Sequence, residues 1–159
     1  MSQSRVDALV ARLEKGRQKT AEVLSALPLE KWRQMVYTGP DWSVTCLLAH
    51  FVSSEEQLLA LARDVAQGGY GAPEGFDIHA FNAQEQERFF GKSPQALLIA
   101  LHSARQQTID WVRTLDDSQM DQAGQHPALG KVSLETMITA IYGHQLLHMR
   151  ELSSKLGGR

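Results

Sequence analysis

Apolar residues recur at intervals of three and four along four separate stretches of the chain, which is the period of one helix face. These stretches cover residues 4–27, 43–66, 94–115 and 134–156. Outside these stretches, no segment shows the alternation of apolar and polar residues that would predict a strand with confidence. Four amphipathic helices with no sheet to cover must turn their apolar faces toward one another. The pattern therefore predicts an all-α fold, an up-and-down type four-helix bundle.

Capping residues mark where three of these helices begin. Ser43 and Ser133 stand immediately before the second and fourth helices, where a serine hydroxyl can accept a hydrogen bond from a free backbone N–H. Ser93 precedes Pro94, and proline at the first helical position loses no hydrogen bond. We therefore expect helix starts at these three serines.

A glycine- and proline-rich stretch, residues 68–75, interrupts the chain after the second helix. A shorter helical piece at about 77–90 follows it, before the third long helix begins. The bundle is therefore expected to carry one extra short helix between the second and third long helices. A length of 159 residues fits one domain, so residues 1–159 are expected to form a single bundle domain.

Composition narrows the class of protein. Sixteen basic residues against 18 acidic ones give a formal charge of −2, which provides no broad positive field for a nucleic acid. No apolar run approaches the roughly 20 residues that a membrane-spanning helix needs, and no signal peptide is evident. We therefore expect a cytoplasmic protein with neither a nucleic-acid nor a membrane partner. A single cysteine, Cys46, excludes an internal disulfide and a multi-cysteine zinc site.

A histidine pair in the fourth helix points to metal binding. His144 and His148 are four residues apart, so their Cβ atoms should lie about 5–6 Å apart on one helix face. Composition alone predicts about 0.2 such pairs in this chain, so the spacing is weak evidence. The stronger evidence is that the pair continues the apolar stripe begun by Met137 and Ile141. A buried imidazole without a partner costs about 1–3 kcal/mol, and a shared metal ion would remove that cost.

His50 is the natural third ligand. It lies about two turns into the second helix among apolar residues, and His144 lies about three turns into the fourth. Three neutral imidazoles and one open position form a catalytic type of metal site. The alternative is that all three are core histidines bonded to ordinary neighbours. Gln145 occupies the place of the glutamate in a His-Glu-x-x-His motif, so a zincin-type protease is not supported.

These residues also resemble a known family. The run from Trp42 to His50, the segment from Gly130 to Leu134, and the His144-x-x-x-His148 pair are similar to the DinB/YfiT-like superfamily, over about residues 6–152. The resemblance implies that His50, His144 and His148 bind nickel, zinc or a similar ion inside a four-helix bundle. Relatives include S-transferases and isomerases that use mycothiol or bacillithiol, and a toxin-resistance branch that acts on reactive small molecules.

Three functions follow as hypotheses. The first is a metal-dependent enzyme, a thiol-dependent S-transferase or related detoxification activity on a small electrophilic molecule. Its cofactors would be a divalent ion, zinc or nickel, and a low-molecular-weight thiol. The second is a non-enzymatic stress protein that binds a metal or a small ligand. The third is a metal-free bundle that acts through self-association, and a homodimer is also compatible with the first two.

Two further residues have two interpretations each. Cys46 stands one turn before His50 and is either a ligand or reactive thiolate, or a small buried residue, which is the commoner case. Glu151 extends the histidine stripe and either orients a ligand imidazole or forms a surface ion pair. The other histidines are expected at surface or rim positions: His79, His102 and His126.

Overall fold

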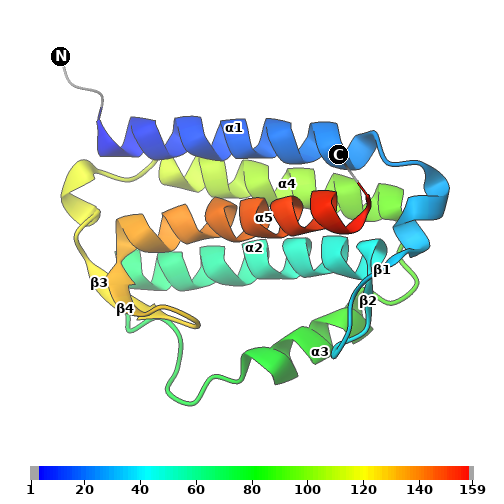
Figure 1. The fold of residues 1–159 in the computed structure, drawn as a ribbon. Coiled ribbons are helices and arrows are strands. Elements are labelled where there is room, and N and C mark those ends of the chain that lie inside the picture. The colour runs from blue at the N-terminus through cyan, green and yellow to red at the C-terminus, as the bar shows by residue number, and fades with distance from the viewer. Residues whose placement is uncertain (1–3, 158–159) are drawn as a thin grey trace.

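The computed structural model describes residues 4–157, and most of them lie in α-helices (Figure 1). The four long helices are α1 (Arg5–Ser25), α2 (Val44–Ala66), α4 (Pro94–Val112) and α5 (Leu134–Lys155). A shorter helix, α3 (Ile78–Arg88), lies between α2 and α4 in the sequence. The all-α four-helix bundle with one extra short helix is therefore confirmed. Ser43, Ser93 and Ser133 each accept a hydrogen bond from a backbone N–H in the first turn of the helix that follows, as predicted.

The long helices do not simply alternate in direction. Figure 1 shows α1 and α5 running one way and α2 and α4 running the other. Each of α1 and α2 packs against both α4 and α5, so α1 and α2 lie diagonally across the bundle. The expected up-and-down order thus holds from α1 to α2 and from α4 to α5. It fails from α2 to α4, because the connection through α3 returns the chain to the end where α2 began.

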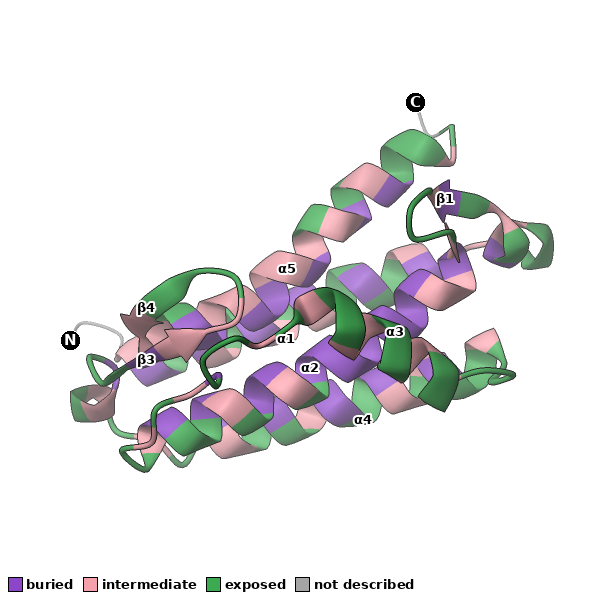
Figure 2. Cartoon of the chain, turned by 90° about the horizontal axis from the view of Figure 1, so that it is seen from below, coloured by how far each residue is buried: buried purple, intermediate pink, exposed green. Residues whose placement is uncertain are grey.

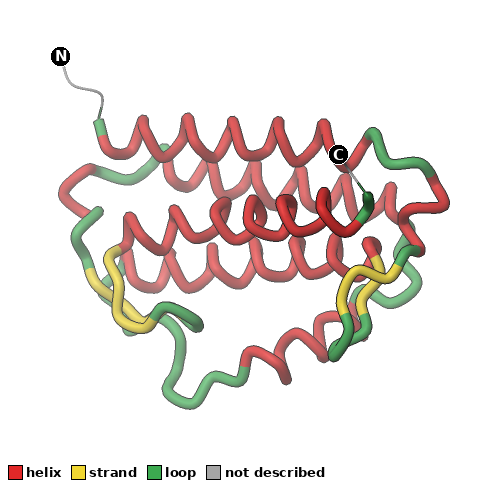
Figure 3. The backbone as a smooth tube through the Cα atoms, viewed as in Figure 1, coloured by secondary structure: helices red, strands yellow, loops and turns green. Residues whose placement is uncertain are grey.

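Four short strands, which the sequence did not predict, form two antiparallel pairs (Figure 3). The strands are β1 (Met35–Tyr37), β2 (Trp42–Ser43), β3 (Ala123–His126) and β4 (Gly130–Ser133). Each strand has only two to four residues, which is too short for a period-two pattern to stand out. The pairs project from the α2 and α5 side of the bundle near its two ends, with α3 between them (Figures 1 and 2).

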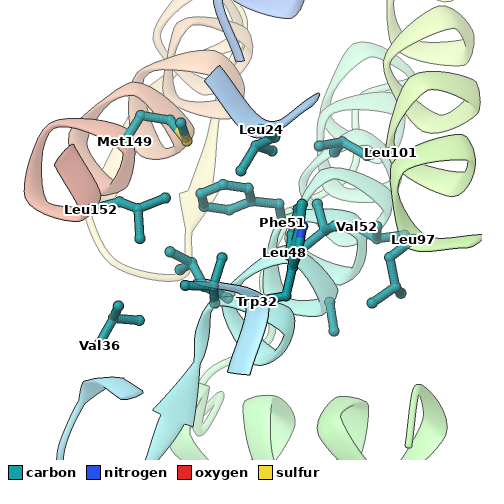
Figure 4. Close-up of a cluster of buried hydrophobic side chains, with 13 residues drawn as sticks. Leu24, Trp32, Val36, Leu48, Phe51, Val52, Leu97, Leu101, Met149 and Leu152 are labelled. Carbon is teal, nitrogen blue, oxygen red and sulfur yellow. The ribbon is translucent and has the colours of Figure 1, made fainter. Parts of the chain in front are cut away.

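Two clusters of buried apolar side chains fill the bundle, and the buried faces of the long helices point inward (Figure 2). The first lies where α1 and α5 end and α2 and α4 begin. Figure 4 shows Phe51 of this cluster among Leu24, Leu48 and Leu101, with Trp32 from the 3-10 helix Leu29–Arg33 beside it. The second cluster occupies the opposite end. Burial of these side chains supplies the main driving force that holds the helices together.

A polar network between the two clusters joins all four long helices. The Arg105 guanidinium on α4 donates to both carboxylate oxygens of Glu55 on α2, at 2.7 and 2.9 Å. Gln145 on α5 and Thr108 on α4 donate to the same carboxylate, at 2.7 and 2.8 Å. Arg105 also donates to the backbone carbonyl of Leu13 on α1 at 3.1 Å. Glu55 and Arg105 are almost completely buried, so this pair fixes the helices without help from solvent.

No helix within residues 4–157 combines the length and the apolar character needed to cross a bilayer.

Candidate metal centre

The packing of α2 against α5 brings three imidazoles together at one point. His50 comes from α2, and His144 and His148 come from successive turns of α5. The Nε2 atom of His144 lies 3.0 Å from Nε2 of His50 and 3.1 Å from Nε2 of His148. A single Nε2–H can satisfy only one of these two contacts well, because each neutral imidazole has one donor and one acceptor nitrogen. Hydrogen bonding among the three rings therefore does not explain the cluster.

The spacing of these nitrogens fits one divalent ion. Ligand nitrogens at about 2.0–2.1 Å from an ion lie about 2.9–3.4 Å apart when the angles between them are about 90–110°. The two Nε2–Nε2 distances at His144 fall within that range. Among residues 4–157, His50, His144 and His148 form the one group of histidine, cysteine or acidic side chains whose ligand atoms lie close enough together to share an ion. The three predicted residues therefore converge as a metal site requires.

Tyr37 and Glu151 determine which nitrogen of His148 carries a proton. The Tyr37 hydroxyl on β1 donates to the Glu151 carboxylate and lies 2.7 Å from Nδ1 of His148. A phenol has one proton, so at His148 the Tyr37 oxygen must accept, and Nδ1 must be the protonated nitrogen. The lone pair of His148 is then on Nε2, which faces the other two histidines. The ring is thus held in the tautomer that a metal ion needs.

Burial keeps the three imidazoles uncharged. Burial, together with the smaller effect of the neighbouring histidines, lowers the pKa of His50 to about 3 and that of His144 to about 4. Burial also lowers the pKa of His148, although Glu151 opposes this. The same burial, together with the hydrogen bond to Glu151, raises the pKa of Tyr37, which stays a phenol. At neutral pH all three histidines are therefore in the neutral form that binds metals.

The metal-free protein is expected to lose stability as the pH falls from about 6.5 toward 4. Unfolded histidine protonates near pH 6.5, whereas folded His50 and His144 protonate near 3 and 4. Between these values the unfolded chain binds more protons, so acid favours unfolding. Urea unfolding at pH 7 and pH 5 should give a lower midpoint at pH 5, and the drop should shrink in His50→Gln. An equal drop in that variant would contradict this origin.

Two cavities open onto the histidine cluster. The first, about 380 Å³, is bounded by Tyr37, Thr38 and Trp42 from the β1–β2 pair and its turn; we call it the β1–β2 cavity. The second, about 410 Å³, is bounded by the segment 126–129 that joins β3 to β4; we call it the β3–β4 cavity. Both contain His50 and His144 in their walls, and His148 lines the first. No Asp, Glu, Lys or Arg among the described residues lines either cavity.

The structure distinguishes between the alternative roles of Cys46 and Glu151 and places His102. Cys46 is outside the three-histidine group, and its thiol accepts a hydrogen bond from Ser43, so it is not a fourth ligand in this arrangement. Glu151 lies 3.6 Å from Nδ1 of His148 and also contacts it through Tyr37, as its orienting interpretation requires. His102 is exposed, as expected.

His79 and His126 were expected at surface or rim positions, and each lines a cavity. His79 is exposed and lines the β1–β2 cavity, and His126 is half-buried and lines the β3–β4 cavity. No sequence pattern pointed to Tyr37. It lies on a strand that was not predicted, and 111 residues separate it from His148 in the chain. Asn82 of α3 lines both cavities, and with Phe81 it belongs to a segment that resembles patterns in branches of the DinB/YfiT-like superfamily.

The sequence matches the model of the DinB superfamily over residues 12–152. The chain belongs to this superfamily. The resemblance seen in the run before His50 and in the histidine pair of α5 is therefore confirmed. No curated protein sequence matches this DinB chain significantly.

Solved structures share the fold. YfiT from Bacillus subtilis, described as a probable metal-dependent hydrolase with an unusual four-helix bundle topology, is 19% identical with a TM-score of 0.74, covering 100% of this chain and 91% of its own. The colibactin self-resistance protein ClbS, in complex with double-stranded DNA, is 14% identical (TM-score 0.72; 98% and 97% covered). A mutant of a mycothiol-dependent maleylpyruvate isomerase is 16% identical (TM-score 0.71; 92% and 60% covered). At these identities the comparisons establish the bundle and its topology.

Proposed function

We infer that this DinB protein is a metal-dependent enzyme that joins a low-molecular-weight thiol to an uncharged electrophilic small molecule. The observation that carries this proposal is the convergence of three neutral imidazoles beneath two cavities. His50, His144 and His148 would hold the ion, zinc or nickel. An ion with three imidazole ligands and a free position supplies Lewis acidity, which lowers the pKa of a bound thiol or water.

The ligand count favours an enzyme over a purely structural metal site. A structural zinc site has four protein ligands, whereas a catalytic site has three and leaves a position for substrate. Within residues 4–157 the group contains three histidines and no carboxylate or thiol close enough to complete it. The cavities give small molecules access to this open side. A binding module that only stiffens the bundle would not need either feature.

The protein groups around the cluster have separate tasks. Tyr37 and Glu151 hold His148 in its binding tautomer. Apart from the ion, the uncharged walls offer no ionic partner, so they favour an electrophile whose body carries no charge. In the reaction a sulfur–carbon bond forms and the thiol proton passes to solvent. The leaving group departs with its electron pair, or, with an activated double bond, the product carbon takes up a proton.

The relatives support thiol chemistry without deciding the substrate. One structural neighbour is a mutant of a mycothiol-dependent maleylpyruvate isomerase, and another is a probable metal-dependent hydrolase. Both activities suit a metal ion with an open position. The proposed substrate is a small molecule. ClbS was solved with double-stranded DNA, but we do not propose DNA as a ligand here. The described cavity walls lack the lysine and arginine side chains that bind a phosphate backbone.

The test is a conjugation assay with zinc- or nickel-loaded protein. Mycothiol, bacillithiol and glutathione would each be mixed with an uncharged electrophile such as 1-chloro-2,4-dinitrobenzene, and the adduct measured. We expect one thiol to react at least about 10³-fold faster than without protein, and His144→Ala to return the rate to background. Turnover of an ester or amide with no thiol reaction would overturn the thiol assignment in favour of hydrolysis. Activity that survives complete metal removal would overturn the metal mechanism.

A further inference from the structure

Helix α3 separates the two cavities that open onto the histidines. Ile78 and Asn82 of α3 line both cavities, together with His50 and His144. Figure 2 shows α3 lying over the bundle between the β1–β2 pair and the β3–β4 pair. The two cavities therefore approach the same pair of imidazoles from opposite sides of α3. Two such approaches would allow two reactants to reach one ion from different sides.

Gly143 is a helical glycine that packing does not explain. It lies inside α5, where glycine costs about 0.5–1 kcal/mol relative to alanine. A Cβ atom at Gly143 would meet nothing within 4 Å. By contrast, a Cβ at Gly16 of α1 would come within 3.5 Å of Arg105 and Tyr142, so that glycine serves close helix packing. Gly143 instead lines the β3–β4 cavity directly beside His144, where its missing side chain leaves the cavity open.

The walls of the β3–β4 cavity define the class of ligand. Leu58, Leu129 and Leu147 supply apolar surface, and the last two are more than half exposed. His126 also lines this cavity: its Nδ1 accepts from the backbone N–H groups of Ala128 and Leu129, both at 3.1 Å, so Nε2 carries the proton. This Nε2–H is buried and has no hydrogen-bond partner among residues 4–157. Ser54, Gln57 and Asn82 add uncharged polar groups to the same walls. These features suit an uncharged molecule with an apolar body.

We propose that the β3–β4 cavity is a separate binding site for an uncharged, apolar-bodied molecule, and that Gly143 keeps it open. Since this rests on the proposed function, it assigns the electrophilic reactant to this cavity. The thiol then enters through the β1–β2 cavity, which is the cavity that His148 and Tyr37 line. A volume of about 410 Å³ is within the usual range of small-molecule sites.

The test uses the uncharged fluorophore N-phenyl-1-naphthylamine as a probe, titrated into zinc-loaded protein. Leucine at Gly143 would fill the β3–β4 cavity, so Gly143→Leu should weaken probe binding by at least about tenfold. Gly143→Ala adds only a Cβ in open space and should bind within about threefold of the parent. Both variants should melt at a higher temperature than the parent, because each removes a helical glycine. That result separates a filled cavity from a damaged fold.

A matched variant in the other cavity completes the design. Ala83→Leu enlarges a residue that lines the β1–β2 cavity only, and should leave probe binding within about threefold. Equal affinity of Gly143→Leu and the parent, loss of binding in Ala83→Leu alone, or no saturable binding to the parent would each overturn the inference. His148 does not line the β3–β4 cavity, so His148→Ala should still bind the probe. Failure of the metal mechanism can therefore be told apart from failure of the second site.

Discussion

Alanine at His148 is expected to abolish metal binding. The substitution removes one of three ligands and also leaves the Tyr37–Glu151 pair without the imidazole that it orients. Two imidazoles on different helices cannot replace the lost bond, so bound metal should fall from one ion per chain to below about a tenth of that. Equilibrium dialysis against zinc or nickel, followed by elemental analysis, measures the effect. A variant that retains a full equivalent would show that the ion is held elsewhere.

Tyr37→Phe and His102→Ala are the matched controls for His148→Ala. Phenylalanine at Tyr37 keeps all three ligands but removes the hydroxyl that fixes the His148 tautomer, so metal affinity should fall by about 10–100-fold. His102 is exposed and outside the cluster, so its replacement should leave metal binding unchanged. This order of effects distinguishes a ligand, an orienting residue and a bystander. An equal loss in all three variants would indicate general unfolding.

Alanine at Arg105 is expected to lower the free energy of unfolding by about 3–5 kcal/mol. The substitution leaves the Glu55 carboxylate buried between α2 and α4 without its cation. Thr108 and Gln145 still donate to that carboxylate, but two neutral donors do not offset a buried negative charge. Urea unfolding of the metal-free protein at pH 7 measures the loss. A cost below about 1 kcal/mol would mean that water reaches Glu55 or that the pair is dispensable.

Two comparisons isolate the effect of the buried charge. Arg113→Ala breaks an exposed pair with Glu14, and such pairs contribute about 0–1 kcal/mol. The double substitution Glu55→Leu with Arg105→Met removes both charges and should recover most of the stability lost in Arg105→Ala. A double variant as unstable as the single one would point to lost packing as the cause.

Helix positions follow from local signals in this chain, and the structure bears this out. The period of the apolar residues and the serines before α2, α4 and α5 mark segments whose ends depend on nearby residues only. The helix directions do not follow from such signals. Whether α4 runs parallel to α2 depends on how far residues 67–93 carry the chain, and neither glycine content nor helix period encodes that distance.

The candidate site divides in the same way. His50, His144 and His148 were predictable because each lies on the apolar face of its helix. When the apolar faces of α2 and α5 pack together, the three imidazoles meet. Tyr37 and His126 lie on short strands without periodicity, so only the three-dimensional structure places them beside the site. The Glu55–Arg105 pair escaped because charged residues on a helix are usually solvated. Its burial becomes visible only once α2 and α4 are packed in register.

The most direct test of the metal centre is elemental analysis and X-ray absorption of protein purified without an affinity tag or chelator. The site predicts about one zinc or nickel ion per chain, with imidazole nitrogens at about 2.0–2.1 Å in its coordination shell. Protein that stays metal-free after exposure to both ions would contradict the account. So would an ion whose spectrum shows no imidazole ligand.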